Sequence, residues 1–100
     1  MSKHLPPFVA ALEKRDPELF GLMQSMIKPV LTPGALDVKT KVLISIAVDA
    51  ISGADKGVKN LAAMARQAGA TDDEIKEALR VAQASANIQF LSTMTAAFAD

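Results

Sequence analysis

Cysteine is absent from this chain of 100 residues. Its absence excludes disulfide bonds, thiolate nucleophiles and thiolate metal ligands together, because each of them needs a cysteine sulfur. Histidine is nearly as scarce. The single imidazole belongs to His4, in a segment that we expect to form a flexible N-terminal tail of residues 1–5, where side chains are usually solvated.

Aromatic residues are also few, with four phenylalanines and no tryptophan or tyrosine, although 50% of the residues are apolar. Alanine supplies much of that apolar content. Since alanine is the best helix former and strands favour aromatic and β-branched residues, this composition predicts an all-α fold. The length suits a single domain over residues 1–100. So much apolar surface on a short chain predicts a homo-oligomer, because large exposed apolar patches are rare on soluble monomers.

An excess of charge of either sign is missing as well. Lysine and arginine number 11, and aspartate and glutamate also number 11, so the basic surface typical of nucleic-acid binding is not expected. No apolar run reaches the ~18 residues of a membrane span, and the first residues lack the apolar core of a signal peptide. We therefore expect a cytoplasmic protein with neither nucleic acid nor a membrane as a partner.

Metal and phosphate motifs are not found in the sequence either. No His-x-x-x-His, Glu-x-x-His or carboxylate cluster occurs at ligand spacing, and the acidic run Asp72–Glu74 is explained by the first turn of a helix. Gly53 and Gly57 lack the following Lys-Ser/Thr of a P-loop. We predict neither a metal nor a cofactor.

Apolar spacing and capping residues predict helices along the whole chain. Asp16 and Asp37 are N-cap residues in this interpretation, Gly69 follows a helix as its C′ residue, and Thr71 with Glu74 forms a capping box. The expected helices cover about residues 6–15, 17–30 with a disturbance at Pro29, 38–52, 55–68, and 72–98 with a kink at Asn87.

The helix expected over residues 38–52 is apolar around most of its circumference, which predicts a central, buried position. Its polar residues form one stripe at spacings of four, four and three: Lys41, Ser45, Asp49 and Ser52. This stripe is either a solvated or subunit-facing edge, or the polar wall of a pocket.

Two segments of the chain resemble the core pattern of the carboxymuconolactone decarboxylase-like family, which includes alkyl hydroperoxidase D. They are Leu43–Gly53 and Ala62–Val81, and the second contains the turn AGAT-x-x-EI. The resemblance covers roughly Leu36 to Ala86, half the chain. It implies an alkyl hydroperoxidase D-like fold of about five to six antiparallel helices, which assembles into trimers or hexamers through its long helices.

Redox members of this family carry a Cys-x-x-Cys-x-x-x-His motif at the start of the helix after the motif glycine, and a glutamate on the preceding helix. In this chain the cysteine positions are Ala54 and Gly57, the histidine position is Leu61 and the glutamate position is Val42. None of these side chains can form a thiolate or deprotonate one, which excludes the thiol peroxidase mechanism. The decarboxylase branch needs no cysteine, but it too typically has a histidine at the position of Leu61.

Three functions remain open. The first is a degenerate active site that binds a small apolar or carboxylated ligand in an inter-helix or inter-subunit pocket. The second is a purely structural or interaction role as a homo-oligomer. The third is a cysteine-independent lactone decarboxylase, in which Asp49, Lys56 or Lys59 supplies the acid and the cation. The candidate ligand-binding residues are Val42, Asp49, Ala54, Lys56, Gly57, Asn60 and Leu61.

Overall fold

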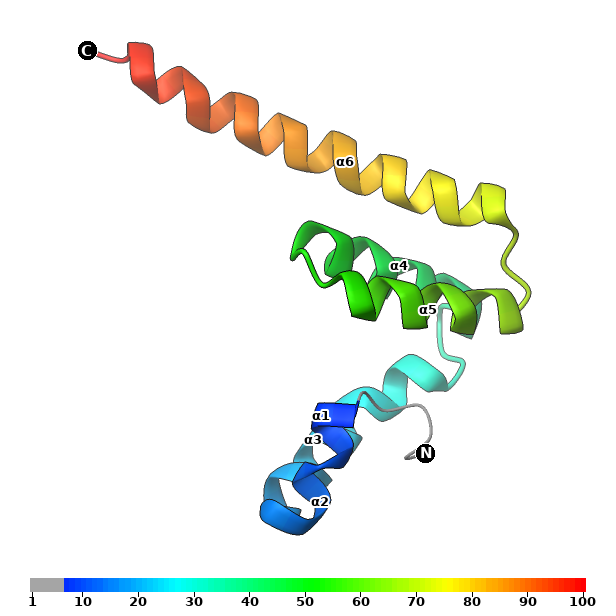
Figure 1. The fold of residues 1–100 in the computed structure, drawn as a ribbon. Coiled ribbons are helices and arrows are strands. Elements are labelled where there is room, and N and C mark those ends of the chain that lie inside the picture. Colours follow the sequence, from blue (N-terminus) through cyan, green and yellow to red (C-terminus); the bar gives the residue numbers. More distant parts are fainter. Residues whose placement is uncertain (1–6) are drawn as a thin grey trace. The chain divides into compact units, whose positions relative to one another are not determined.

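The computed structural model describes residues 7–100, in which every element of regular structure is a helix (Figure 1). The predicted all-α fold is therefore confirmed. His4 and the predicted tail over residues 1–5 lie outside the described residues. The chain divides into two compact units, one ending at Lys41 and the other covering Val42–Asp100. The prediction of a single domain over residues 1–100 stays a prediction.

The first unit holds the helices α1 (Pro7–Ala10), α2 (Leu12–Arg15) and α3 (Pro17–Leu31). Asp16 caps α3 as predicted, because its Oδ1 accepts a hydrogen bond from the Leu19 N–H at 3.1 Å. Helix α3 continues through Pro29 instead of ending there. Proline lacks a backbone N–H and so removes one helical hydrogen bond. Because Pro29 is only two residues from the end of α3, few of the helix's hydrogen bonds are affected.

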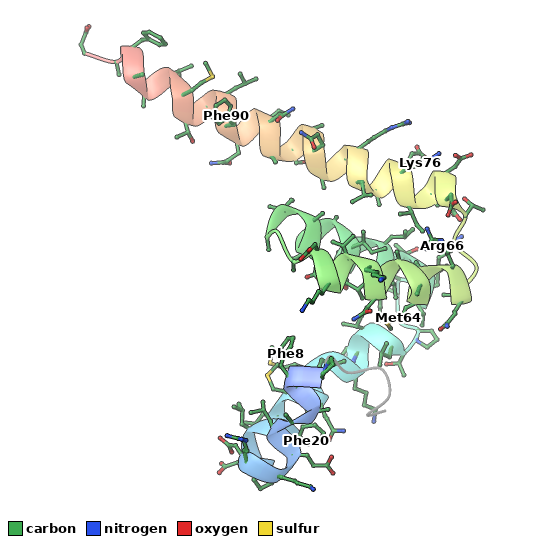
Figure 2. The ribbon with its side chains drawn as sticks, viewed as in Figure 1. Phe8, Phe20, Met64, Arg66, Lys76 and Phe90 are labelled. Atoms are coloured by element: carbon green, nitrogen blue, oxygen red, sulfur yellow. The ribbon has the colours of Figure 1, made fainter. Side chains whose placement is uncertain are left out.

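The core of the first unit is small and is built around Val9 and Phe20, and Figure 2 labels the phenylalanine. Three partly buried side chains pack against them: Leu12, Met23 and Ile27. Positions 20, 23 and 27 follow at spacings of three and four, which places them on one face of α3. The apolar periodicity of α3 thus explains which of its residues form this core. Phe8 lies outside the core and is 76% exposed.

Helix α4 (Val38–Ile51) begins at its predicted cap. The Thr40 N–H donates a hydrogen bond to Asp37 Oδ1 at 2.8 Å. Side-chain and backbone hydrogen bonds from Thr40 hold the pKa of Asp37 below its ordinary value, because they favour the charged carboxylate. The cap therefore acts in its ionised form at neutral pH.

Lys41, in the first turn of α4, connects this helix to the end of α3. Its Nζ donates hydrogen bonds to the carbonyl oxygens of Pro29, at 2.7 Å, and Thr32, at 2.8 Å. Carbonyls at a helix C-terminus have no partner within the helix, and a cation there also meets the negative end of the helix dipole. The lysine thus fixes the loop between the two helices.

The second unit contains most of α4, followed by α5 (Asp55–Gln67), α6 (Asp72–Met94) and the 3-10 turn η2 (Thr95–Phe98). Between α5 and α6, Gly69 has a φ of +96°. Its N–H donates to Arg66 O at 3.0 Å, and the Ala70 N–H donates to Ala65 O at 2.8 Å. This is a Schellman motif, which confirms Gly69 as the C′ residue.

The capping box that opens α6 is also confirmed. The Thr71 hydroxyl accepts from the Glu74 N–H at 3.1 Å, and the Glu74 carboxylate accepts from the Thr71 N–H at 2.9 Å. Two amides without helical partners are thereby satisfied. Helix α6 then runs without interruption through Asn87, where a kink was expected.

The core of the second unit lies between the first half of α6 and the other two helices. Its largest fully buried side chains are Val42 and Ile46, and the other buried apolar residues are Ala65, Ala70, Ile75 and Ala82. Every residue of α6 after Ala82 is exposed. With 23 residues, against 14 in α4, α6 is about 35 Å long where α4 is about 21 Å. Its second half therefore runs past α4 and α5 (Figure 1).

None of the helices within residues 7–100 combines the length and the apolar character that crossing a bilayer would require.

Candidate functional site

The candidate site lies where α4 ends and α5 begins. Gly53 has a φ of +75°; its N–H donates to Ala50 O at 3.2 Å, and the Ala54 N–H donates to Asp49 O at 2.9 Å. These bonds form a second Schellman motif, in which a glycine accommodates the left-handed backbone without strain. The turn reverses the chain and places the first turn of α5 against the last turn of α4.

The side chain of Asp49 lies against Gly57 in this arrangement. A Cβ atom added at Gly57 would be 3.2 Å from Asp49 Cγ and 3.7 Å from Ala54 Cβ, and it would collide with Asp49 Oδ2. The carboxylate thus fills the space that any side chain at position 57 would need. A negative charge is favourable at the start of a helix, and Ala54 as the N-cap residue supplies no side-chain acceptor of its own.

We predict that Gly57→Ala has a stabilising and a destabilising effect on the free energy of unfolding, and that the destabilising one depends on Asp49. Alanine in a helix is worth about 0.5–1 kcal/mol over glycine, but here its methyl group must displace the carboxylate. The gain should therefore be small or absent in the native background and complete in an Asp49→Ala background. Urea unfolding of the four proteins in this double-mutant cycle should give a coupling free energy of about 1 kcal/mol.

Gly21→Ala provides the matched control, since Gly21 lies within α3 and has nothing within 4 Å of an added Cβ. It should stabilise the protein by about 0.5–1 kcal/mol whichever residue is at position 49. Equal effects of Gly57→Ala in both backgrounds would show that Asp49 does not compete for this space.

The other candidate residues differ in exposure. Ala54, Lys56 and Asn60 are exposed, and Leu61 is half-buried. Val42 is only 1% exposed, so its side chain belongs to the core of the second unit. At 3.6 residues per turn, Lys56 and Asn60 flank Gly57 on one side of α5, whereas Lys59 projects from nearly the opposite side. The exposed polar groups nearest to Asp49 on α5 are therefore those of Lys56 and Asn60.

The polar stripe of α4 has several different contacts. Lys41 binds the carbonyls at the end of α3, Asp49 lies against Gly57, and the Ser52 hydroxyl donates to Val48 O at 2.9 Å. No single role for the stripe follows from these contacts. Within residues 7–100, no group of three or more histidine, cysteine, aspartate or glutamate side chains is placed to hold a metal ion.

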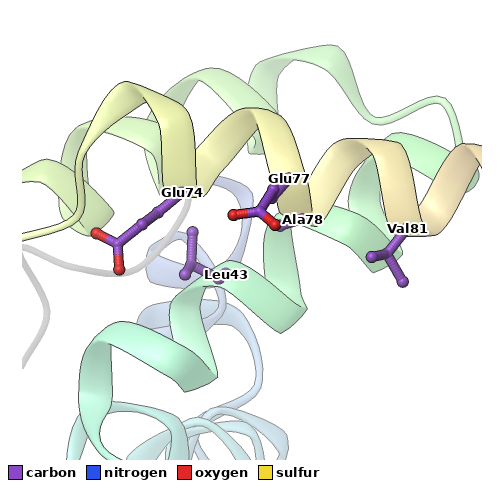
Figure 3. Close-up of a pocket in the computed structure, with 5 residues that line it drawn as sticks. All are labelled: Leu43, Glu74, Glu77, Ala78 and Val81. Atoms are coloured by element: carbon purple, nitrogen blue, oxygen red, sulfur yellow. The ribbon is translucent and has the colours of Figure 1, made fainter.

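A hollow that the sequence patterns did not predict lies between α4 and α6 (Figure 3). It is open to solvent and has a volume of about 330 Å³. Its lining residues are Leu43, Glu74, Glu77, Ala78 and Val81. The Glu74 carboxylate already serves the capping box, so helix capping accounts for one of the two acids. The sequence gives only a weak signal for this hollow, because Leu43 is one of many apolar residues around α4.

Comparison with protein families gives a match that covers most of the chain. The model of the carboxymuconolactone decarboxylase family matches residues 17–99, from the start of α3 to the end of the 3-10 turn. Comparisons with curated proteins and with solved structures give no match.

Proposed function

Since the chain belongs to the carboxymuconolactone decarboxylase family, we propose that it is a member without thiol peroxidase activity that binds a small apolar or carboxylated molecule at the first turn of α5. The position of Asp49 carries this proposal. Its carboxylate lies against Gly57, a position at which the resemblance places a cysteine in redox relatives. A polar group is thus present at this position, but its chemistry is that of an acid.

The charges around Asp49 define how such a ligand would bind. Lys56 is the exposed cation on this side of α5 and would pair with a ligand carboxylate. Asp49 would repel the same group and would instead accept a hydrogen bond from a hydroxyl at the other end of the ligand. Asn60, one turn after Gly57, adds an amide that can both donate and accept, and Leu61 adds an apolar contact.

A second subunit would complete the binding site in this proposal. Ala54, Lys56 and Asn60 are exposed, whereas small-molecule sites usually bury most of the ligand surface. An inter-subunit pocket, with this turn as one wall, would meet that requirement. The proposal therefore includes a homo-oligomer.

Thermal unfolding with a panel of carboxylated lactones, aromatic acids and fatty acids tests the proposal. A ligand present at 100 times its Kd stabilises a protein by about 2.7 kcal/mol, which raises the Tm of a domain of this size by roughly 10 °C or more. The rise should disappear in Lys56→Ala but persist in Lys59→Ala, the control that removes the same charge from a position nearly opposite Gly57 on α5. If no compound in the panel raises the Tm, ligand binding is wrong. Lactone conversion in the same samples distinguishes binding from turnover.

A structural homo-oligomer is the second candidate function, and one observation favours it. Ile44, Val48 and Ile51 follow at spacings of four and three on one face of α4, and each is at least 50% exposed. An apolar stripe of this kind is typical of a subunit interface.

A further inference from the structure

The first unit is held together almost entirely by apolar packing. Helices α1 and α2 pack against α3, and Val9 and Phe20 are the only buried residues among positions 7–41. The hydrogen bonds of residues 7–27 join positions no more than four apart, so none of them connects α1 or α2 with α3. The attachment of these two helices therefore depends on the few apolar side chains between them.

Met23 is the only sulfur-containing side chain in this small core, whose other members are Val9, Leu12, Phe20 and Ile27. It lies one turn after Phe20 and one turn before Ile27, on the face of α3 that packs against α1 and α2. Its side chain is half-buried, so a molecule as small as a hydroperoxide can reach it. Met26, three positions later, is 70% exposed and lies outside the core.

We propose that Met23 is an oxidation site, and that its sulfoxide releases α1 and α2 from α3. In this reaction the thioether sulfur attacks the terminal oxygen of a hydroperoxide, an S–O bond forms and the O–O bond breaks. The hydrogen of the attacked oxygen moves to the leaving oxygen, which departs as an alcohol, or as water when the oxidant is hydrogen peroxide. The sulfur is oxidised by two electrons, and the peroxide is reduced by the same two.

A sulfoxide at position 23 cannot stay where the thioether lies. Its oxygen is a strong hydrogen-bond acceptor, and burying such a group without a donor is unfavourable. The core offers no side-chain donor, because its other side chains are all hydrocarbons. Turning the sulfoxide out to solvent removes one of the few side chains that attach α1 and α2. Helix α3, with 15 residues, then lies alone in water, where helices of this length are only marginally stable.

The second unit does not share this sensitivity. None of its buried side chains contains sulfur. A polar contact also joins two of its helices, because Arg66 Nε of α5 lies 3.0 Å from Asp72 Oδ1 of α6. Oxidation of Met23 is therefore expected to open the first unit and to leave α4, α5 and α6 folded. The ligand site proposed above lies in the second unit, so the role of Met23 is independent of it.

Hydrogen–deuterium exchange of the purified full chain, before and after hydrogen peroxide, tests this site. The background carries Met64→Leu and Met94→Leu, which leaves the second unit without methionine. After oxidation the amides of α3 should exchange at least about tenfold faster, because local opening exposes them, while those of α4–α6 keep their rates. Met23→Leu, a change of similar volume, should abolish the acceleration. Met26→Leu is the matched control and should leave the acceleration unchanged.

Glutamine imitates the polar sulfoxide without any oxidant, which keeps the test decisive if Met23→Leu itself loosens the unit. Met23→Gln should speed exchange in α3 without peroxide, and Met26→Gln should not. Mass spectrometry of the peptides that contain the two methionines shows which of them is oxidised. The proposal is overturned if Met23 is oxidised and exchange in α3 does not change, if Met26→Leu protects in place of Met23→Leu, or if Met23 stays reduced after Met26 is fully oxidised.

Discussion

The purified protein is expected to consume at most five equivalents of hydroperoxide per chain and then to stop. The thiol peroxidase mechanism needs a thiolate that attacks the peroxide and is regenerated, and the chain has no cysteine. Its five methionines can each be oxidised once to the sulfoxide, which a dedicated reductase must reverse. Peroxide remaining over time, measured with and without a dithiol reductant against a protein-free blank, gives the number of equivalents.

An added cysteine supplies the positive control for this assay. Ala54→Cys places a thiol at an exposed position, and with reductant present its peroxide consumption should continue beyond that of the native protein. Gly57→Cys needs Asp49→Ala beside it, because the carboxylate fills the space of a side chain at position 57. Sustained turnover by native protein from two independent purifications would contradict the expectation.

The helix ends were the most predictable part of the fold, because they depend on neighbours in sequence. Asp16, Asp37 and the capping box at Thr71 each act through backbone amides three residues away, a distance that any helix fixes. Gly69 was likewise predictable as a C′ residue, because glycine adopts the positive φ of that position without strain. The extent of α6 was predicted as well, but the kink expected at Asn87 is absent, since asparagine disfavours a helix only weakly.

The candidate site was predictable only in part, because its contacts cross between helices. Asp49 and Gly57 were both candidate binding residues from the sequence, but the overlap of the carboxylate with a side chain at position 57 depends on the Schellman turn at Gly53. Val42 stays a predicted pocket residue, and its side chain is buried in the core of the second unit. A residue on a helix that is apolar all round can face either way, and only packing decides.

Ile46→Ala is expected to cost about 2–5 kcal/mol of unfolding free energy, the usual range for deleting a buried isoleucine side chain to Cβ. Ile46 is 0% exposed and is one of the two largest fully buried side chains. Because the free energy of unfolding of a small domain is only about 5–15 kcal/mol, this single change removes a large part of the stability. Ile44, two positions earlier on the same helix, has a side chain that is 50% exposed. Ile44→Ala deletes the same atoms and should change the free energy of unfolding by less than about 1 kcal/mol. Urea unfolding followed by circular dichroism compares them at one protein concentration, because subunit association adds to apparent stability. Similar losses would place both side chains in contact with protein, as when a second copy covers the outer face of α4.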